Sequence, residues 1–263
     1  MKVYIITLGC KVNQYESEVM LELFLDYGFE KANKIESADV IIINSCTVTA
    51  TSDQKVRQMI NRTKEKNANA IIVLTGCMPQ AFPEVVNTLD NVDIILGNTN
   101  RSNVFDSVIS FISNHQRIVD IQPHRKVDSF EKMSVAKFHG RTRAFVKIED
   151  GCNRFCSYCI IPYARGRVRS KSLSDLENEV LRLSKSGYTE VVLVGINLSA
   201  YGQDIGMHLC DAVETACRVE NIERVRLGSL EPEKMDYGVL KRLSLQEKLC
   251  PQFHLSLQSE CDS

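Results

Sequence analysis

Three apolar runs in the first third of the chain each end in a cysteine. VYIITLGC ends at Cys10, ADVIIINSC ends at Cys46 and AIIVLTGC ends at Cys77. The runs are nearly continuous and rich in β-branched residues, which is typical of buried parallel strands, and a helical pattern follows each of them. A fourth run, at residues 92–98, has the same form. This order of strands and helices predicts an α/β fold with a doubly wound parallel sheet and right-handed crossovers. Its helices are expected at residues 17–27, 50–66, 83–90 and 104–113.

The first cysteine group consists of Cys10, Cys46 and Cys77. The carboxyl ends of parallel strands meet at one edge of a sheet, where ligands bind. The three thiols are therefore expected close together, although 36 and 31 residues separate them along the chain. Buried structural cysteines are the alternative, because a free cysteine packs as a small hydrophobe. Three thiols at the same point of three successive strands favour a three-thiolate metal site.

The second cysteine group, Cys152, Cys156 and Cys159, forms a C-x3-C-x2-C motif directly after a predicted strand, RAFVKIED. Three thiolates this close in sequence face one centre only when the loop curls around it. Zinc is one alternative, but a structural zinc site takes four protein ligands, and the fourth would have to come from a remote part of the chain. An iron–sulfur cluster held by three cysteines keeps one iron open for a further ligand.

These motifs carry a family resemblance. The loop GCNRFCSYCIIPYARG, with Tyr158 before its last cysteine, resembles the cluster loop of radical S-adenosyl-L-methionine (SAM) enzymes. Together with TLGCKVNQYES, IIINSCTVT and VLTGCMPQ, it resembles the radical SAM methylthiotransferases, which act on tRNA or on a ribosomal protein. The resemblance implies two [4Fe-4S] clusters. The second cysteine group would hold the cluster that binds and cleaves SAM, and the first group would hold an auxiliary cluster involved in sulfur delivery.

The first motif also suggests a subfamily. TLGCKVNQYES resembles the enzymes that act on N6-threonylcarbamoyladenosine, the modified adenosine next to the anticodon. The resemblance implies that a methylthio group is added to C2 of this base. It also implies the tRNA anticodon loop as a partner, and an electron donor such as flavodoxin or ferredoxin. The isopentenyladenosine and ribosomal-protein subfamilies remain alternatives, as does an inactive truncated paralogue or fragment that only binds clusters or zinc.

The remainder of the chain predicts the first part of a (β/α) barrel. An amphipathic helix at residues 173–186, capped by Ser172 or Ser174, precedes a strand at 190–197. A helix at 210–219, a strand at 224–232 and a last strand from residue 251 follow. Family cores are six-unit partial barrels, and an arc of four strands would leave an exposed parallel edge. We therefore expect a radical SAM core that is truncated at its C-terminal end and lacks the small tRNA-binding TRAM domain.

Polar residues at the ends of the barrel strands are candidate SAM contacts. They are Gly195, Asn197, Ser229, Glu231, Ser256, Gln258 and Ser259. No residue is assigned a catalytic role. Glu260 stands where the family usually has glycine, and it does not permit the close backbone approach or positive φ that glycine allows. The other four cysteines, Cys210, Cys217, Cys250 and Cys261, match no family ligand and are expected to be packing residues.

Composition limits the class of protein further. The chain has 263 residues with 32 Lys+Arg and 33 Asp+Glu, and no apolar run approaches the ~18 residues of a membrane span. Its start becomes polar too soon for a secretory signal, so a cytoplasmic protein without a membrane partner is expected. Ten cysteines in a reducing compartment indicate metal or redox chemistry rather than disulfides. The predicted domains are residues 1–112 and 139–263, joined by a polar linker at 113–138.

A basic segment surrounds the second cysteine group. Residues 137–171 contain nine Lys/Arg and two acidic residues. Within it, Arg165, Arg167 and Arg169 alternate in a way that suits an RNA phosphate backbone. A solvated charged face, or an arginine bound to the SAM carboxylate, is the alternative interpretation.

Overall fold

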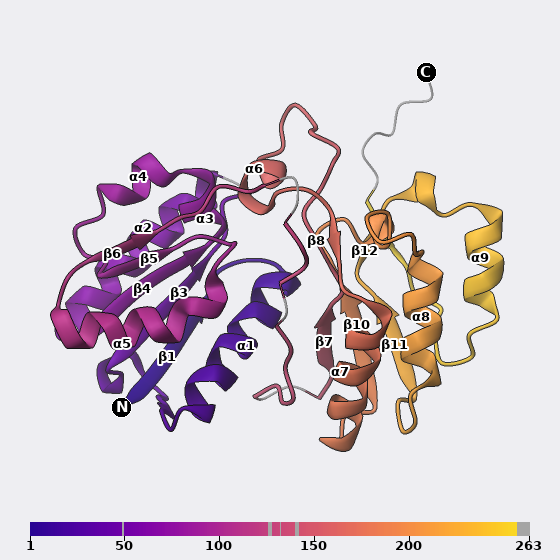
Figure 1. Cartoon of the computed structure of the whole chain (residues 1–263), viewed down its shortest axis with the longest axis horizontal. Helices are drawn as coiled ribbons and strands as arrows, with labels where there is room; N and C mark the ends of the chain where they lie inside the picture. Colours follow the sequence, from indigo (N-terminus) through magenta and orange to yellow (C-terminus); the bar gives the residue numbers. More distant parts are fainter. Residues whose placement is uncertain (49, 126–127, 132, 140–141, 257–263) are drawn as a thin grey trace. The chain divides into compact units, whose positions relative to one another are not determined.

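A computed structural model shows two compact units (Figure 1). It describes residues 1–48, 50–125, 128–131, 133–139 and 142–256. The first unit comprises Met1–Arg125 together with Arg154–Gly166, and the second comprises Lys126–Asn153 together with Arg167–Ser263. The segment that carries Cys156 and Cys159 therefore groups with the N-terminal unit. The domains predicted from the sequence place the same segment in the second domain, at residues 139–263.

The first unit is built on a six-stranded sheet in the order β2-β1-β3-β4-β5-β6, and every neighbouring pair is parallel. The strands are β1 (Lys2–Thr7), β2 (Glu30–Lys31), β3 (Val40–Ser45), β4 (Ile71–Gly76), β5 (Ile94–Leu96) and β6 (Ile118–Asp120). The predicted doubly wound parallel sheet is confirmed. One strand, β6, lies within the segment that was expected to be a linker, because a three-residue strand in a mainly polar segment gives too weak a strand pattern.

Helices connect these strands and cover the sheet. They are α1 (Lys11–Asp26), η1 (Ile35–Ser37), α2 (Ala50–Lys66), α3 (Cys77–Ala81), α4 (Pro83–Asn87), η2 (Arg101–Asn103) and α5 (Val104–Asn114). Val56 and Ile60 of α2 pack with Ile41 and Ile43 of β3 in one buried cluster. Helix α1 begins six residues earlier than the apolar pattern predicts, because its first turns bury polar Asn13 and Glu16 beside apolar Val12 and Tyr15.

The second unit contains two parallel sheets. β7 (Ala144–Lys147), β10 (Glu190–Val194) and β11 (Arg224–Leu227) form a sheet in the order β11-β10-β7, and β12 (Ser229–Leu230) pairs in parallel with β13 (His254–Leu255). β8 (Glu149–Asp150) and β9 (Arg169–Ser170) form an antiparallel pair. The strands and helices alternate as predicted for the start of a (β/α) barrel.

The helices of this unit are α7 (Leu173–Lys185), η3 (Leu198–Ala200), α8 (Leu209–Arg218), η4 (Pro232–Lys234) and α9 (Tyr237–Ser244). Ser172 caps α7, because its hydroxyl accepts a hydrogen bond from the backbone N–H of Asp175 at 3.1 Å. Of the two serines considered from the sequence, Ser172 is therefore the cap. The short helix α6 (Ile161–Arg165) belongs to the first unit.

Gly76, at the end of β4, provides a test of this geometry. Its φ is +100°, and a Cβ placed there would lie 2.4 Å from the carbonyl oxygen of Ser45. We predict that Gly76→Ala lowers the free energy of unfolding by about 3 kcal/mol, because the backbone cannot move away. Gly28 also has a positive φ, +83°, but open space around it. Gly28→Ala should cost about 1 kcal/mol, and equal losses in urea unfolding would contradict the steric argument.

Candidate functional site

The first cysteine group lies at the carboxyl ends of three neighbouring strands. Cys10 follows β1 and occupies the N-cap position of α1, Cys46 follows β3, and Cys77 is the first residue of α3 directly after β4. Cys10 is exposed, Cys46 is half-buried and Cys77 is buried, and all three are free thiols. The topology thus brings the three residues to one edge of the sheet.

The electrostatics of Cys77 include the other two thiols of the first cysteine group. Burial raises the pKa of the Cys77 thiol, and the charges of Cys46 and Cys10 raise it further, whereas the guanidinium of Arg165 acts in the opposite direction. A Cβ placed at Gly9 would lie only 3.1 Å from the Cβ of Cys46. The Cys10 loop therefore lies directly against the Cys46 loop.

A hydrogen-bond network fixes the loops that carry these thiols. The side-chain amide of Asn13 donates to Asn44 Oδ1 and to the carbonyl of Ser45, both at 3.1 Å. The amide of Asn44 donates to the carbonyl of Asn13 at 3.0 Å and to Ser17 Oγ at 3.1 Å. Ser45 Oγ donates to the carbonyl of Thr75 at 2.7 Å. The network links the chain beside each of the three cysteines.

Three thiols at one edge have the donor chemistry of an iron–sulfur cluster. Within the residues that the structure describes, no group of three or more His, Cys, Asp or Glu side chains is gathered so that it could hold a single metal ion. A cluster is larger than one ion, and its open iron needs no fourth protein ligand. The residues of the first group therefore fit a cluster better than they fit zinc, which takes four protein ligands in structural sites.

The second cysteine group follows β8. Cys156 is exposed, and Cys152 and Cys159 are half-buried, all as free thiols. The backbone N–H of Cys159 donates to the carbonyl of Cys156 at 2.9 Å, and Phe155 adopts a positive φ of 48°. This local turn presents Cys156 and Cys159 from one curled segment. Three free thiols in such a loop fit the three-cysteine ligation of a [4Fe-4S] cluster.

The structure places the predicted SAM contacts at strand ends of the second unit. Asn197 follows β10, and its side-chain amide lies 3.6 Å from the sulfur of Cys152. Ser229 on β12 hydrogen-bonds Ser256 beyond β13 at 2.7 Å, and the N–H of Glu231 donates to Ser199 Oγ at 2.8 Å. Gln258, Ser259 and Glu260 lie outside the described residues. Among the predicted contacts that the structure describes, Asn197 lies beside Cys152 of the second cysteine group.

Glu149 is a buried carboxyl that the sequence analysis did not single out. It lies on β8, three residues before Cys152, and accepts the backbone N–H of Asn197 at 2.7 Å through Oε2. A Cβ at Gly195 would lie 2.6 Å from the same oxygen, so a larger residue there would displace the Glu149 side chain. Burial, and then the charge of Asp150, raise the pKa of Glu149 well above its ordinary value. Its position near the end of the predicted strand RAFVKIED was the sequence signal that could have identified Glu149.

The Glu149 Oε1 and Asn197 Oδ1 atoms, both buried, have no hydrogen-bond partner in the described part of the chain. Buried polar atoms are costly unless they form a hydrogen bond. They lie at the strand end that carries Cys152, where the sequence predicts SAM contacts. This pair gives the Asn197 prediction a physical basis.

The expectation that Arg165, Arg167 and Arg169 together contact phosphate is wrong for two of them. Arg165 is fully buried and forms a fork with Glu16, and Arg169 is buried between Asp150 and Asp128. Both guanidinium groups are thus neutralised by carboxylates of the protein. Arg167 is exposed. Sequence alternation could not reveal this, because charge spacing does not show which side chains face inward.

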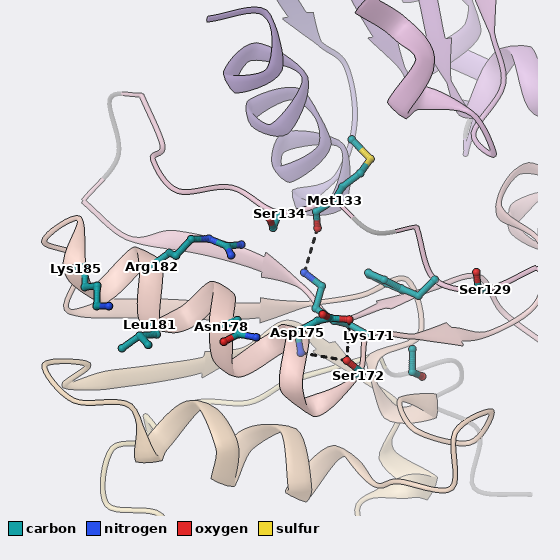
Figure 2. Close-up of a pocket in the computed structure, with 12 residues that line it drawn as sticks. Ser129, Met133, Ser134, Lys171, Ser172, Asp175, Asn178, Leu181, Arg182 and Lys185 are labelled. Carbon is teal, nitrogen blue, oxygen red and sulfur yellow. Dashed lines mark hydrogen bonds between the residues drawn. The ribbon is translucent and has the colours of Figure 1, made fainter. Parts of the chain in front are cut away.

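A cavity of about 530 Å³ lies elsewhere in the second unit, between α7 and the chain at Phe130 and Met133 (Figure 2). Phe130, Met133 and Leu181 contribute its apolar wall. The ammonium of Lys171 already binds Glu179 and the carbonyl of Met133. The cavity is lined by neither cysteine group and by none of the predicted SAM contacts.

Three of the remaining cysteines behave as packing residues. Cys210, Cys217 and Cys250 are buried free thiols. Burial raises the pKa of Cys217 to about 11, which keeps this thiol protonated and unreactive. Cys261 lies outside the described residues.

Comparison with known families agrees with the two-part architecture. The model of the uncharacterized protein family UPF0004 matches residues 2–97, and the model of the radical SAM superfamily matches residues 146–259. A radical S-adenosylmethionine methyltransferase, TsrM, from Kitasatospora setae has a similar structure, with a TM-score of 0.66 over 97% of this chain and 58% of that one. At 15% sequence identity, this likeness shows a shared fold.

Curated relatives match nearly the whole chain. Threonylcarbamoyladenosine tRNA methylthiotransferase MtaB of Aquifex aeolicus is 39% identical over 98% of this chain and 63% of its own length. MtaB of Bacillus subtilis is 37% identical over 96% of this chain and 56% of its own length. A tRNA-2-methylthio-N(6)-dimethylallyladenosine synthase of Pelotomaculum thermopropionicum is 34% identical over 98% of this chain and 60% of its own length. The chain thus spans less than two thirds of the length of these relatives.

The parallel β/α strands and the cysteine loop at residues 152–159 define the second part of the chain as a member of the radical SAM superfamily, whose chemistry implies a [4Fe-4S] cluster and SAM. With the UPF0004 region ahead of it, the chain belongs to the radical SAM methylthiotransferase family. No helix in the described part of the chain is both long and apolar enough to cross a membrane.

The raised pKa of Glu149 makes a prediction about stability. Above the ordinary glutamate pKa, the unfolded chain releases a proton that the folded chain keeps. The contribution of Glu149 to the free energy of unfolding is therefore complete below that pKa and is lost as the pH rises through the folded-state pKa. Glu149→Gln cannot ionise. Urea unfolding should therefore show a smaller loss of stability between about pH 5 and about pH 8 in this variant than in the wild type.

Glu190 supplies the matched control. Burial opposes its ionisation, but hydrogen bonds from Arg226 and Arg224 outweigh burial and lower the pKa of its carboxyl. Glu190 stays ionised over the same pH range, so Glu190→Gln should leave the slope of stability against pH unchanged. A wild-type slope in Glu149→Gln would show that Glu149 is not protonated in the folded chain.

Proposed function

We propose that the chain is the cluster-binding part of a tRNA methylthiotransferase that modifies C2 of N6-threonylcarbamoyladenosine next to the anticodon. The observation that carries this proposal is the convergence of Cys10, Cys46 and Cys77 at one sheet edge, in a chain that also contains the radical SAM cysteine loop. Residues 1–112 would hold the auxiliary cluster, and residues 139–263 would belong to the SAM-binding core.

The protein's own residues have distinct tasks in this proposal. When bound, the two clusters and SAM would supply the electron, the radical and the sulfur. The Asn13–Asn44 network would hold the auxiliary ligands at the strand ends. Asn197 would orient Cys152 through its amide, and the unpartnered Glu149 Oε1 and Asn197 Oδ1 atoms would meet polar groups of SAM. Positioning of this kind is the main contribution of a protein to cofactor chemistry.

The relatives are named for two different modified adenosines, and the chain is slightly more identical to one group than to the other. The relatives named for threonylcarbamoyladenosine in Aquifex aeolicus and Bacillus subtilis are 39% and 37% identical to the chain, and the relative named for dimethylallyladenosine in Pelotomaculum thermopropionicum is 34% identical. The motif around Cys10 favours the first group. The tRNA anticodon loop and a small reducing protein such as flavodoxin or ferredoxin are the proposed partners.

Iron content tests the cluster assignment. After anaerobic reconstitution, we expect about eight iron atoms in each wild-type chain, as two [4Fe-4S] clusters. The Cys152/Cys156/Cys159→Ala variant should retain about four, because the first cysteine group is intact. Cys217→Ala is the control and should retain all of them, since that thiol is a packing residue. Colourless protein containing zinc would contradict the proposal.

Nucleoside analysis tests the substrate. Mass spectrometry of hydrolysed tRNA from a strain without this gene should show complete loss of the methylthio derivative of threonylcarbamoyladenosine. The methylthio derivative of isopentenyladenosine in the same sample is the internal control and should persist. Loss of the isopentenyl derivative instead would show that the other subfamily assignment is correct.

A further inference from the structure

A fully buried group of charges joins three distant segments of the first unit. Glu16 on α1 faces Arg165 at the end of α6, with Oε1 2.6 Å from Nη1 and Oε2 3.1 Å from Nη2. Arg101 in η2 adds a third contact, with its Nη1 3.0 Å from Glu16 Oε1. All three side chains are at most 1% exposed. The planar fork of a guanidinium on a carboxylate fixes both distance and orientation.

The neighbours of this charge group connect it to both cysteine groups. Glu16 lies six residues after Cys10, in the helix whose Asn13 and Ser17 bond the strand next to it. Arg165 lies six residues after Cys159, and α6 packs against α3, the helix that begins at Cys77. The charges of both Arg165 and Glu16 reach the Cys77 thiol.

Neutral hydrogen bonds hold the same segment. Asn98, which accepts a hydrogen bond from Arg101 Nη1 at 2.6 Å, donates its amide to the carbonyl of Ala164 at 2.6 Å. His124 Nε2 lies 3.2 Å from the same carbonyl. The chain just after the second cysteine group is therefore bound to the first unit by Asn98, which follows β5, and by His124, which follows β6. The Glu16–Arg165 ion pair adds a charged contact to the same segment.

We propose that Glu16 is a positioning residue, which through Arg165 holds the segment carrying Cys156 and Cys159 on the unit that carries the first cysteine group. The inference rests on the proposed function, because it is the spacing of two clusters that Glu16 would set. Removing one partner of a buried ion pair leaves an uncompensated charge, so the segment should detach rather than rearrange locally. Glu16 touches neither cluster nor substrate in this role.

Hydrogen–deuterium exchange on the full chain without clusters tests the attachment. In Glu16→Gln, amides of residues 160–166 should exchange at least about tenfold faster than in the wild type, because α6 loses its buried anchor. Glu179→Gln is the matched control: it removes a carboxylate that is equally buried and bound to Lys171, but lies in the second unit. The control should leave residues 160–166 at the wild-type rate.

Electron paramagnetic resonance on the reconstituted chain tests the consequence. Both clusters should be present in Glu16→Gln by iron content, yet the magnetic coupling between the two reduced clusters should differ from the wild type, while Glu179→Gln keeps the wild-type coupling. A role in general stability would not alter coupling between intact clusters. Arg165→Lys keeps the positive charge but loses the two-point contact with Glu16, so it should produce a smaller change in both measurements. This variant replaces Glu16→Gln in the test if Glu16→Gln does not fold.

The outcomes separate this inference from the proposed function. Wild-type protein that binds fewer than two clusters would count against the proposed function, and the exchange result would still report on the attachment. Wild-type exchange at residues 160–166 in both Glu16→Gln and Arg165→Lys would overturn the positioning role. An equal acceleration in Glu179→Gln would also overturn it, because the effect would then be one of general stability.

Discussion

The paired amides of Asn13 and Asn44 are the interaction on which the first cysteine group depends. Each donates to the other residue, at 3.1 Å and 3.0 Å, and both side chains are buried. A buried amide left without a partner costs about 1–3 kcal/mol, so the two residues are stable in one arrangement only. Asn13 lies three residues after Cys10 and Asn44 two residues before Cys46. The relative position of these thiols is therefore set by the protein before any cluster binds.

The sheet itself could be predicted because its physical signal is strong. Ile41, Ile42 and Ile43 are all completely buried, as expected for a central parallel strand covered on both faces, and such strands appear in sequence as continuous β-branched runs. Convergence of the cysteines then follows from topology alone, since parallel strands end at one edge. The helix after Cys10 was predicted too short, because the polar residues Asn13 and Glu16 occupy buried positions and interrupt the apolar pattern of its first turns.

The role of the charged residues could not be predicted in the same way. Lys147, Lys171 and Arg169 looked like members of an RNA-binding surface, but each is buried against a carboxylate. Their partners are Asp150 and Glu179, and nothing in residue spacing indicates that pairing. A basic segment in a sequence gives the number of cations, whereas binding to phosphate depends on how many remain exposed. Any RNA contact of this segment must therefore use its exposed residues, such as Arg167.

Buried ion pairs in this chain are better understood as devices for positioning than as sources of stability. Desolvation offsets most of the attraction between two buried charges, and apolar side chains of similar size often stabilise a protein as well. What an apolar contact lacks is a preferred orientation, which the fork between Glu16 and Arg165 supplies. The three aromatic residues of segment 154–166, Phe155, Tyr158 and Tyr163, are exposed and do not anchor the segment by burial. A charged anchor at Arg165 therefore fixes a loop that hydrophobic packing alone would leave unspecified.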